Sequence, residues 1–311
     1  MSIFRYHKSK IMLLSFLYIF FLYLLFPFND LGDLVASKVS ELTSGQIFIN
    51  FDTLDLSIVP QPGLELTNVN VETAFTSRLT AKSLSVAPNV AGLLTFKPGV
   101  SIYAEELLGG DISLSTRGSG KTAAGKTKQK LNIELENLNL AEIVKLTQMP
   151  IRLTGDLSGS VDSNFDIDFT EQPSGTIQLE ASKVIMPDSS VNTMMGPLSL
   201  PKLILNDIIF ESKADKGIYE ISKFIIGKPG GDLYANATGR IDLKVLKSGT
   251  EVYSQLNQYD LTVKFQVGEA FKQKLGIFLS FLEKCQASTN SYSCRFVGQN
   301  LYGPPSITKV Q

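Results

Sequence analysis

Histidine and cysteine are scarce in this chain of 311 residues, which has one histidine, His7, and two cysteines, Cys285 and Cys294. A zinc site of the usual histidine and cysteine type cannot be built from these residues. A Ser-His-Asp triad is excluded unless His7 takes part in it. We therefore expect no enzyme, no metal and no cofactor, because any catalysis would have to rely on carboxylates, lysines or tyrosines.

The chain also lacks an excess of charge of either sign. Its 29 lysines and arginines face 30 aspartates and glutamates, for a net charge of −1. This balance excludes a generic basic nucleic-acid binder, so no nucleic-acid partner is expected. The apolar content of 43% is enough for a buried core, which excludes wholesale disorder.

One long apolar run does stand near the start of the chain. Residues 11–28 carry no charge, and as a helix they would span about 27 Å, close to the hydrocarbon thickness of a bilayer. A buried core helix of this length would show a polar stripe. A cleaved signal peptide would have a shorter run ending in small residues, where this chain has Leu25, Phe26 and Phe28. The run predicts an uncleaved transmembrane anchor.

The charges that flank the run predict its orientation. Arg5, Lys8 and Lys10 precede it, while Lys38 is the one basic residue among the twenty that follow it. Positive charge stays on the cytoplasmic side of a membrane. We therefore expect a basic cytoplasmic tail over 1–10, a single span, and a body outside the cytoplasm. This is the topology of a bacterial inner-membrane protein with a periplasmic domain.

The two cysteines lie close together in a polar C-terminal stretch. In an oxidising compartment Cys285 and Cys294 would close a small disulfide loop within a C-terminal tail over 285–311. The alternative is two free thiols that never meet.

An amphipathic helix is predicted directly after the anchor, over 29–45. Asn29 or Asp30 would cap its start and Gly45 would end it. Its apolar positions recur at helical spacing: Leu31, Leu34, Val35, Val39 and Leu42. This stripe needs a partner, which is either the membrane surface or the first strands.

From residue 46 to 284 the hydrophobic period changes to two, which is typical of strands with one dry and one wet face. The alternating segments are 47–51, 64–66, 69–71, 131–135, 165–169, 177–179, 203–205 and 261–267. Turn formers rather than regular helices separate them, so we expect a mainly β fold with a curved antiparallel sheet. Two helices, predicted over 140–148 and 269–284, would cover the dry face of this sheet or lie over the mouth of a groove.

Two motifs resemble catalytic or nucleotide-binding sites. Residues 120–127 read GKTAAGKT and fit the phosphate-loop pattern, but a strand pattern follows where a helix is required. A lysine-rich hairpin loop is the better interpretation, and its lysines would meet anionic lipid head groups or an acidic partner. Asp166 and Asp168 share one face of a predicted strand, where we expect a solvated surface rather than a general acid and base.

Taken together, these features resemble a known family. The basic start, the single anchor, the amphipathic helix ending in Ser44-Gly45, the run QIFINFDTLDLSIVPQPGLELTNVNVE, the segment SLSVAPN and the turn-strand GGDISLS are similar to type II secretion system protein N (GspN-type), within the AsmA-like group. The resemblance covers most of residues 1–245. It implies an inner-membrane accessory protein of the machine that exports folded proteins. It also implies a curved sheet with an apolar groove that handles lipid, and it supplies no catalytic residues.

Two hypotheses about function follow. In the first, the protein is a structural or assembly component of a type II secretion apparatus and contacts other secretion proteins through its exposed strand edges. In the second, it binds or transfers phospholipid in an apolar groove. The candidate groove residues are Leu64, Leu66, Ile133, Leu135, Leu203, Leu205, Val263 and Phe265. Alternation alone does not separate a filled core from an empty groove, and it leaves strand order, sheet closure and oligomeric state open.

Overall fold

The computed structural model describes residues 12–15, 17–18, 21, 31–57, 62–73, 78–147, 152–193, 196–249, 251–269, 271–272, 282–299 and 305–310. The predicted anchor over 11–28 lies mostly outside these residues. Residues 12–15, 17–18 and 21 are helical, but no helix within the described ranges is long and apolar enough to cross a membrane. Most of the helix predicted over 269–284 also lies outside them.

The described fold is mainly β, with few and short helices. The helices are α3 (Gly32–Leu42), α4 (Val90–Leu94), α5 (Leu140–Thr147) and the 3-10 turn η2 (Glu283–Cys285). The strands of the first half are β1 (Ile47–Asn50), β2 (Thr53–Ser57), β3 (Gly63–Thr73), β4 (Leu79–Pro88), β5 (Val100–Leu107), β6 (Gly110–Lys121), β7 (Thr127–Asn139), β8 (Thr154–Asp166) and β9 (Ser174–Met186). Those of the second half are β10 (Ser189–Thr193), β11 (Gly196–Leu200), β12 (Leu203–Asp215), β13 (Ile218–Ile226), β14 (Leu233–Ser248), β15 (Glu251–Val267), β16 (Gln286–Ser288), β17 (Ser291–Gly298) and β18 (Ser306–Lys309).

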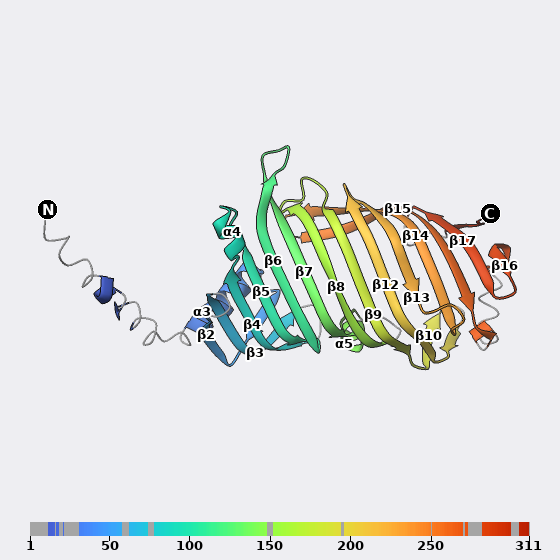
Figure 1. Cartoon of the computed structure of the whole chain (residues 1–311), viewed down its shortest axis with the longest axis horizontal. Helices are drawn as coiled ribbons and strands as arrows, with labels where there is room; N and C mark the ends of the chain where they lie inside the picture. Colours follow the sequence, from blue (N-terminus) through green and yellow to red (C-terminus); the bar gives the residue numbers. More distant parts are fainter. Residues whose placement is uncertain are drawn as a thin grey trace.

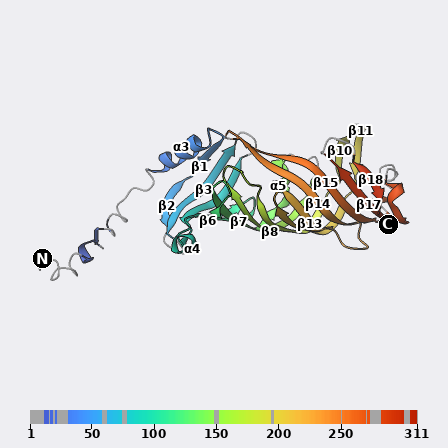
Figure 2. The same ribbon diagram turned by 90° about the horizontal axis from the view of Figure 1, so that it is seen from above.

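Sixteen strands form one long antiparallel sheet that does not close on itself. Their order is β1-β3-β4-β5-β6-β7-β8-β9-β12-β13-β14-β15-β17-β16, with β2 also on β3 and β18 also on β17, while β10 and β11 form a separate hairpin. At about 4.8 Å between neighbouring strands, this path is about 60 Å long. Figure 1 shows the sheet as a twisted band, and Figure 2 shows that it curls about its long axis with α5 on the inner side.

Aligned β-bulges shape one end of the sheet, the lower end in Figure 1. Glu106, Asn137, Lys183 and Asn206 all have positive φ, and each stands at a register shift of β5, β7, β9 or β12. A bulge adds one residue, so it reverses the inward and outward alternation and bends the strand. The inward-facing residues on the two sides of the Asn137 bulge are therefore separated by an odd number of positions.

Helices α3 and α5 cover parts of the inner face at this end. Both correspond to predicted helices, and the stripe of α3 packs on the first strands: Leu31 and Val35 contact a core formed by Leu54, Leu66, Val69 and Ala81. Leu140 of α5 packs in a second core with Ala181, Val184, Met186, Leu203 and Leu205. A small third cluster joins Val267 and Tyr292. The buried cores are therefore local and lie where helices or bulged strands cover the sheet.

The last part of the chain belongs to the sheet. The sequence separates 285–311 as a tail, but β17 pairs with β15 along its whole length, and β16 and β18 pair with successive parts of the other side of β17. Short strands of mixed polarity carry too weak an alternation to be recognised in the sequence. The β-rich body thus continues past residue 284.

Candidate functional site

Residues directly opposite each other in an antiparallel pair point to the same face, so the pairing register shows which side chains line up across the sheet. Two rows, apolar apart from Ser212 and Lys309, run across fourteen strands, from β2 to β18. Row A is Leu56, Leu64, Val86, Ile102, Leu114, Ile133, Val161, Ile177, Ser212, Ile221, Gly239, Leu261, Phe296 and Ile307. Row B is Leu54, Leu66, Leu84, Ala104, Ile112, Leu135, Gly159, Leu179, Phe210, Phe224, Ala237, Val263, Cys294 and Lys309.

A third, shorter row lies below row B, toward the bulges. Row C is Leu138, Leu157, Ala181, Ile208, Ile226, Ala235, Phe265 and Tyr292. The ring centroids of Phe265 and Tyr292 are 4.9 Å apart in a stacked pair. Because Ala181 of row C belongs to the core under α5, rows A to C and the helices lie on the same side of the sheet.

The sequence-predicted groove residues all lie on this inner face. Leu64 and Ile133 are in row A, and Leu66, Leu135 and Val263 are in row B. Phe265 is in row C, while Leu203 and Leu205 lie in the core under α5. The structure therefore brings these residues onto one surface, but it divides them into two groups by burial.

Exposure separates the filled parts of the inner face from its open part. Leu66, Leu203 and Leu205 are 4–6% exposed and belong to cores. Ile133 and its row A neighbours on β6, β8 and β9 are only half-buried, although they lie in the middle of the sheet. Among the described residues, the middle of rows A and B is thus an apolar surface without the close cover of a core. We call this half-exposed part of rows A and B the trough.

The outer face of the same strands is polar. It carries exposed ion pairs, which contribute at most about 1 kcal/mol each: Lys82–Glu105, Lys130–Asp162, Lys223–Glu211 and Arg295–Asp260. The contrast between the two faces is what the alternation predicts. It gives apolar ligands one face to bind, the inner one.

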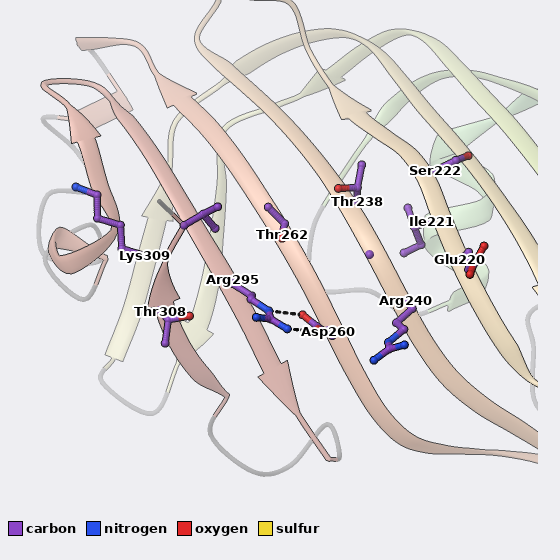
Figure 3. A pocket seen from close by; sticks show the side chains of 12 residues that line it. Glu220, Ile221, Ser222, Thr238, Arg240, Asp260, Thr262, Arg295, Thr308 and Lys309 are labelled. Atoms are coloured by element: carbon purple, nitrogen blue, oxygen red, sulfur yellow. Dashed lines mark hydrogen bonds and ion pairs between the residues drawn. The ribbon is translucent and has the colours of Figure 1, made fainter.

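A polar hollow of about 720 Å³ lies on the outer face over β13, β14, β15, β17 and β18 (Figure 3). Its Arg295 is held by Asp260 through two hydrogen bonds of 2.6 and 2.7 Å. This contact lowers the pKa of Asp260 and raises that of Arg295. Arg240 and Glu220 also line the hollow. Its lining has three basic residues, with Lys309, against two acidic ones, and Arg295 is already paired with Asp260, so the hollow is a weaker candidate than the trough.

Asp166, at the end of β8, organises the turn between β8 and β9. Its side chain is 2% exposed and accepts hydrogen bonds of 3.0–3.1 Å from Asp168, Thr170 and Glu171. Burial raises the pKa of Asp166, but these hydrogen bonds to the charged carboxylate outweigh it and hold the pKa below its ordinary value. The prediction of a solvated strand face is wrong for Asp166, which is buried under the turn, while Asp168 is exposed but lies beyond the end of β8.

We call the end of the strands that carries the β6–β7, β8–β9 and β14–β15 turns the upper rim (Figure 1). Here the β8–β9 turn contacts the strands that lead into the β14–β15 turn. The Gln172 side chain donates to the carbonyl of Val245 at 3.0 Å and accepts from its N–H at 2.8 Å. Lys247 pairs with Asp168 at 3.1 Å. Since β12 and β13 separate β9 from β14 in the sheet, these contacts show that the β14–β15 arm, residues 243–256, bends across the curled rim.

The loop over 120–127 forms part of this rim. It joins β6 directly to β7, and no helix follows it, so the hairpin interpretation of this motif is confirmed. Lys126 pairs with Asp168 at 3.0 Å, and Lys128 pairs with Glu171 at 2.6 Å. These lysines lower the pKa values of both carboxyl groups and tie the hairpin to the β8–β9 turn.

The two cysteines meet in the structure as buried free thiols. Cys285 lies 3.7 Å from the carbonyl oxygen of Thr308. Burial, together with the hydrogen bond to Cys285, raises the pKa of Cys294 to about 12. The alternative of two thiols that never meet is therefore wrong, and the disulfide stays a prediction that depends on export.

Alkylation tests the predicted bridge together with the predicted compartment. In protein isolated without reductant from bacterial membranes, we expect iodoacetamide in denaturant to label neither cysteine, and to label both after reduction. The reason is that an exported pair of neighbouring thiols is oxidised, whereas the cytosol keeps thiols reduced. Labelling of both cysteines before reduction would contradict the bridge. In the folded, reduced protein Cys294 should react slowly, because this buried thiol holds little thiolate at neutral pH.

No group of metal-ligating side chains occurs within the described part of the chain. Comparisons with protein-family models, curated proteins and solved structures found no match. The assignment of the trough as the candidate site therefore rests on the geometry of this chain alone. Sequence reasoning found the dry face but missed the Asp166 and Gln172 contacts, because they depend on pairing between distant strands.

Proposed function

We propose that this protein binds the acyl chains of lipids along the trough and transfers lipid in the bacterial cell envelope. The observation that supports the proposal is the pair of apolar rows that continue from strand to strand while their middle members stay half-exposed. Each methylene group removed from water contributes about 0.8 kcal/mol, so a water-facing row of this length favours an apolar ligand. Across β6 to β9 the trough measures about 15 Å at about 4.8 Å per strand, which leaves room for acyl chains.

The proposal includes the membrane anchor and the compartment. Residues 11–28 span the inner membrane, with residues 1–10 in the cytoplasm and the curved sheet in the periplasm. The charge asymmetry and the uncharged run support this topology. Helices α3 and α5 cover the inner face at the bulged ends of the strands, α3 over the first strands and α5 beside β7 and β8, and leave the middle members of rows A and B for ligand.

Lipid analysis of the purified full-length chain tests the proposal. We expect phospholipid to remain with the protein after extraction in mild detergent and gel filtration, in a defined ratio by native mass spectrometry. A chain that retains no phospholipid under conditions that keep its fold would contradict lipid binding. Because the outer face is polar, we expect detergent not to bind there and not to displace lipid from the inner face.

A second function is favoured by the open ends of the sheet. At one end β1 and β2 both pair with β3, and at the other β16 and β18 both pair with β17, so each end presents short edge strands. Edge strands offer main-chain groups to a partner strand. We propose an accessory role in a type II secretion apparatus as this second candidate. It predicts that secretion components are recovered after mild crosslinking in cells, and their absence together with retained lipid would exclude it.

A further inference from the structure

The loop between β4 and β5 displays large apolar side chains to solvent. It contains α4, and the exposed fractions are 51% for Leu93, 78% for Leu94 and 95% for Phe96. Burial of such side chains contributes about 1.5–3 kcal/mol each, so a cluster of them at one tip is costly without a partner. The sequence pattern did not single out this segment.

Hydrogen bonds fix the conformation of the β4–β5 loop. The side chain of Asn89 caps α4 by accepting from the N–H of Gly92 at 2.9 Å, and it donates to the carbonyl of Thr116 on β6 at 3.2 Å. The N–H of Lys97 returns to the carbonyl of Gly92 at 2.7 Å. Phe96 has a φ of 54°, a conformation that a bulky residue rarely adopts. The fold thus holds Phe96 outward, at a conformational cost.

Two basic residues, Lys97 and Arg117, lie beside the tip, and the Asp162 that lines a hollow with Arg117 is paired with Lys130. Lys97 follows Phe96, and Arg117 stands on β6 beside Gly118, whose N–H donates to the carbonyl of Pro98 at 3.3 Å. Neither Lys97 nor Arg117 forms an ion pair with another described residue. Residues 86–104 and 112–133 contain no aspartate or glutamate at all.

The tip lies at the end of the sheet where the N-terminal segment joins it (Figure 1). Helix α3 precedes β1, and α4 follows β4, two strands further along the sheet. Along the strands the two differ: β1 begins opposite Thr73 at one end of β3, whereas α4 follows Val86, which is opposite Leu64 at the other end. The same edge of the sheet exposes Leu42 by 82% and Phe48 by 55%, at the end of β3 away from α4. The uncharged run 11–28 ends just before α3. An anchor over 11–28 would therefore join the sheet at the same edge as the tip.

We propose that the β4–β5 loop docks on a bilayer surface, with Leu94 and Phe96 inserted among the acyl chains and Lys97 and Arg117 against anionic lipid phosphates. Apolar residues flanked by basic ones are the side-chain pattern of segments that lie in the membrane interface. Docking at this point fixes the N-terminal end of the trough against the membrane. The inference does not rest on the trough, because the contact needs only the loop and its charges.

Tryptophan fluorescence of the full-length chain in vesicles tests this contact, since the protein has no tryptophan of its own. The variant Leu94→Trp is reconstituted in phosphatidylcholine and phosphatidylglycerol vesicles that carry nitroxide-labelled acyl chains. The matched control is Ile218→Trp, at a position that is also on the upper rim, is 44% exposed and lies far along the sheet. We expect Leu94→Trp to emit at shorter wavelength and to lose most of its emission to the nitroxides, and Ile218→Trp to emit as in water.

Adding Lys97→Glu and Arg117→Glu to Leu94→Trp tests the electrostatic part of the contact. We expect the charge-reversed variant to lose most of the quenching in anionic vesicles, because both basic contacts become repulsive. Equal, water-like emission from Leu94→Trp and Ile218→Trp would overturn the proposal, and so would quenching that is unaffected by charge reversal. Lipid retained by the purified chain is measured separately, so failure of docking and failure of the trough remain distinguishable.

Discussion

In the full-length protein, Ile133→Asp is expected to release the phospholipid that co-purifies with the wild type. Ile133 lies in the middle of row A, half-buried, between Leu114 and Val161. A carboxylate placed against acyl chains costs several kcal/mol unless it is hydrogen-bonded. Since about 1.4 kcal/mol corresponds to a factor of ten in affinity, we expect bound lipid to fall at least about tenfold. Phosphate analysis per mole of protein measures this change.

The matched control stands one residue away. Asn132 points to the outer face of β7 and is opposite Asp162 on β8, so Asn132→Asp introduces the same charge without touching the trough. We expect this variant to retain lipid at the wild-type level. Circular dichroism should show that both variants keep their β content. Equal loss of lipid from the two variants would mean that the inner face is not the binding surface.

The substitution Asp166→Asn is expected to have the largest effect on stability among the rim residues. The buried carboxylate accepts four hydrogen bonds, and a neutral amide with one carbonyl oxygen cannot replace them all. Hydrogen bonds to a charged group contribute more than neutral ones, so we expect a loss of about 3 kcal/mol in the free energy of unfolding. Urea unfolding followed by circular dichroism measures it, with Asp215→Asn at an exposed position as the control.

The pH dependence of this difference checks its cause. The hydrogen bonds hold the pKa of Asp166 below its ordinary value of 3.8. The ionised carboxylate therefore stabilises the fold fully above that value, and the contribution is lost as pH falls through the lower pKa of the folded state. The difference between wild type and Asp166→Asn should be complete at pH 7 and shrink on acidification. A difference that does not change with pH would assign the effect to packing instead.

The sequence predicts the strands and the dry face because both depend on local alternation. Ile133 and Leu135 follow the two-residue period and lie in neighbouring rows. The next inward residue is Leu138, three positions on, because the bulge at Asn137 reverses the alternation. A bulge depends on the register with β8, so the period alone does not place it.

Contacts between distant segments could not be predicted from the sequence, because they also depend on the pairing register between strands. The rows become continuous only when every register is known, since a slip of one residue moves a strand's side chains to the other face. Gln172 reaches Val245 only because the sheet curls. The exposed tip at Phe96 was missed because a short apolar segment is typical of a core. Burial distinguishes the two cases and is a tertiary property.

Photocrosslinking with a phospholipid that carries a diazirine in its acyl chain tests the central claim most directly. The reagent is incorporated in membranes that contain the full-length protein, and the modified peptides are mapped by mass spectrometry. An open lipid-binding trough predicts adducts on inner-face residues of β6 to β9, such as Leu114, Val161 and Ile177, in addition to any on residues 11–28. Adducts confined to 11–28, with none on rows A and B, would contradict it.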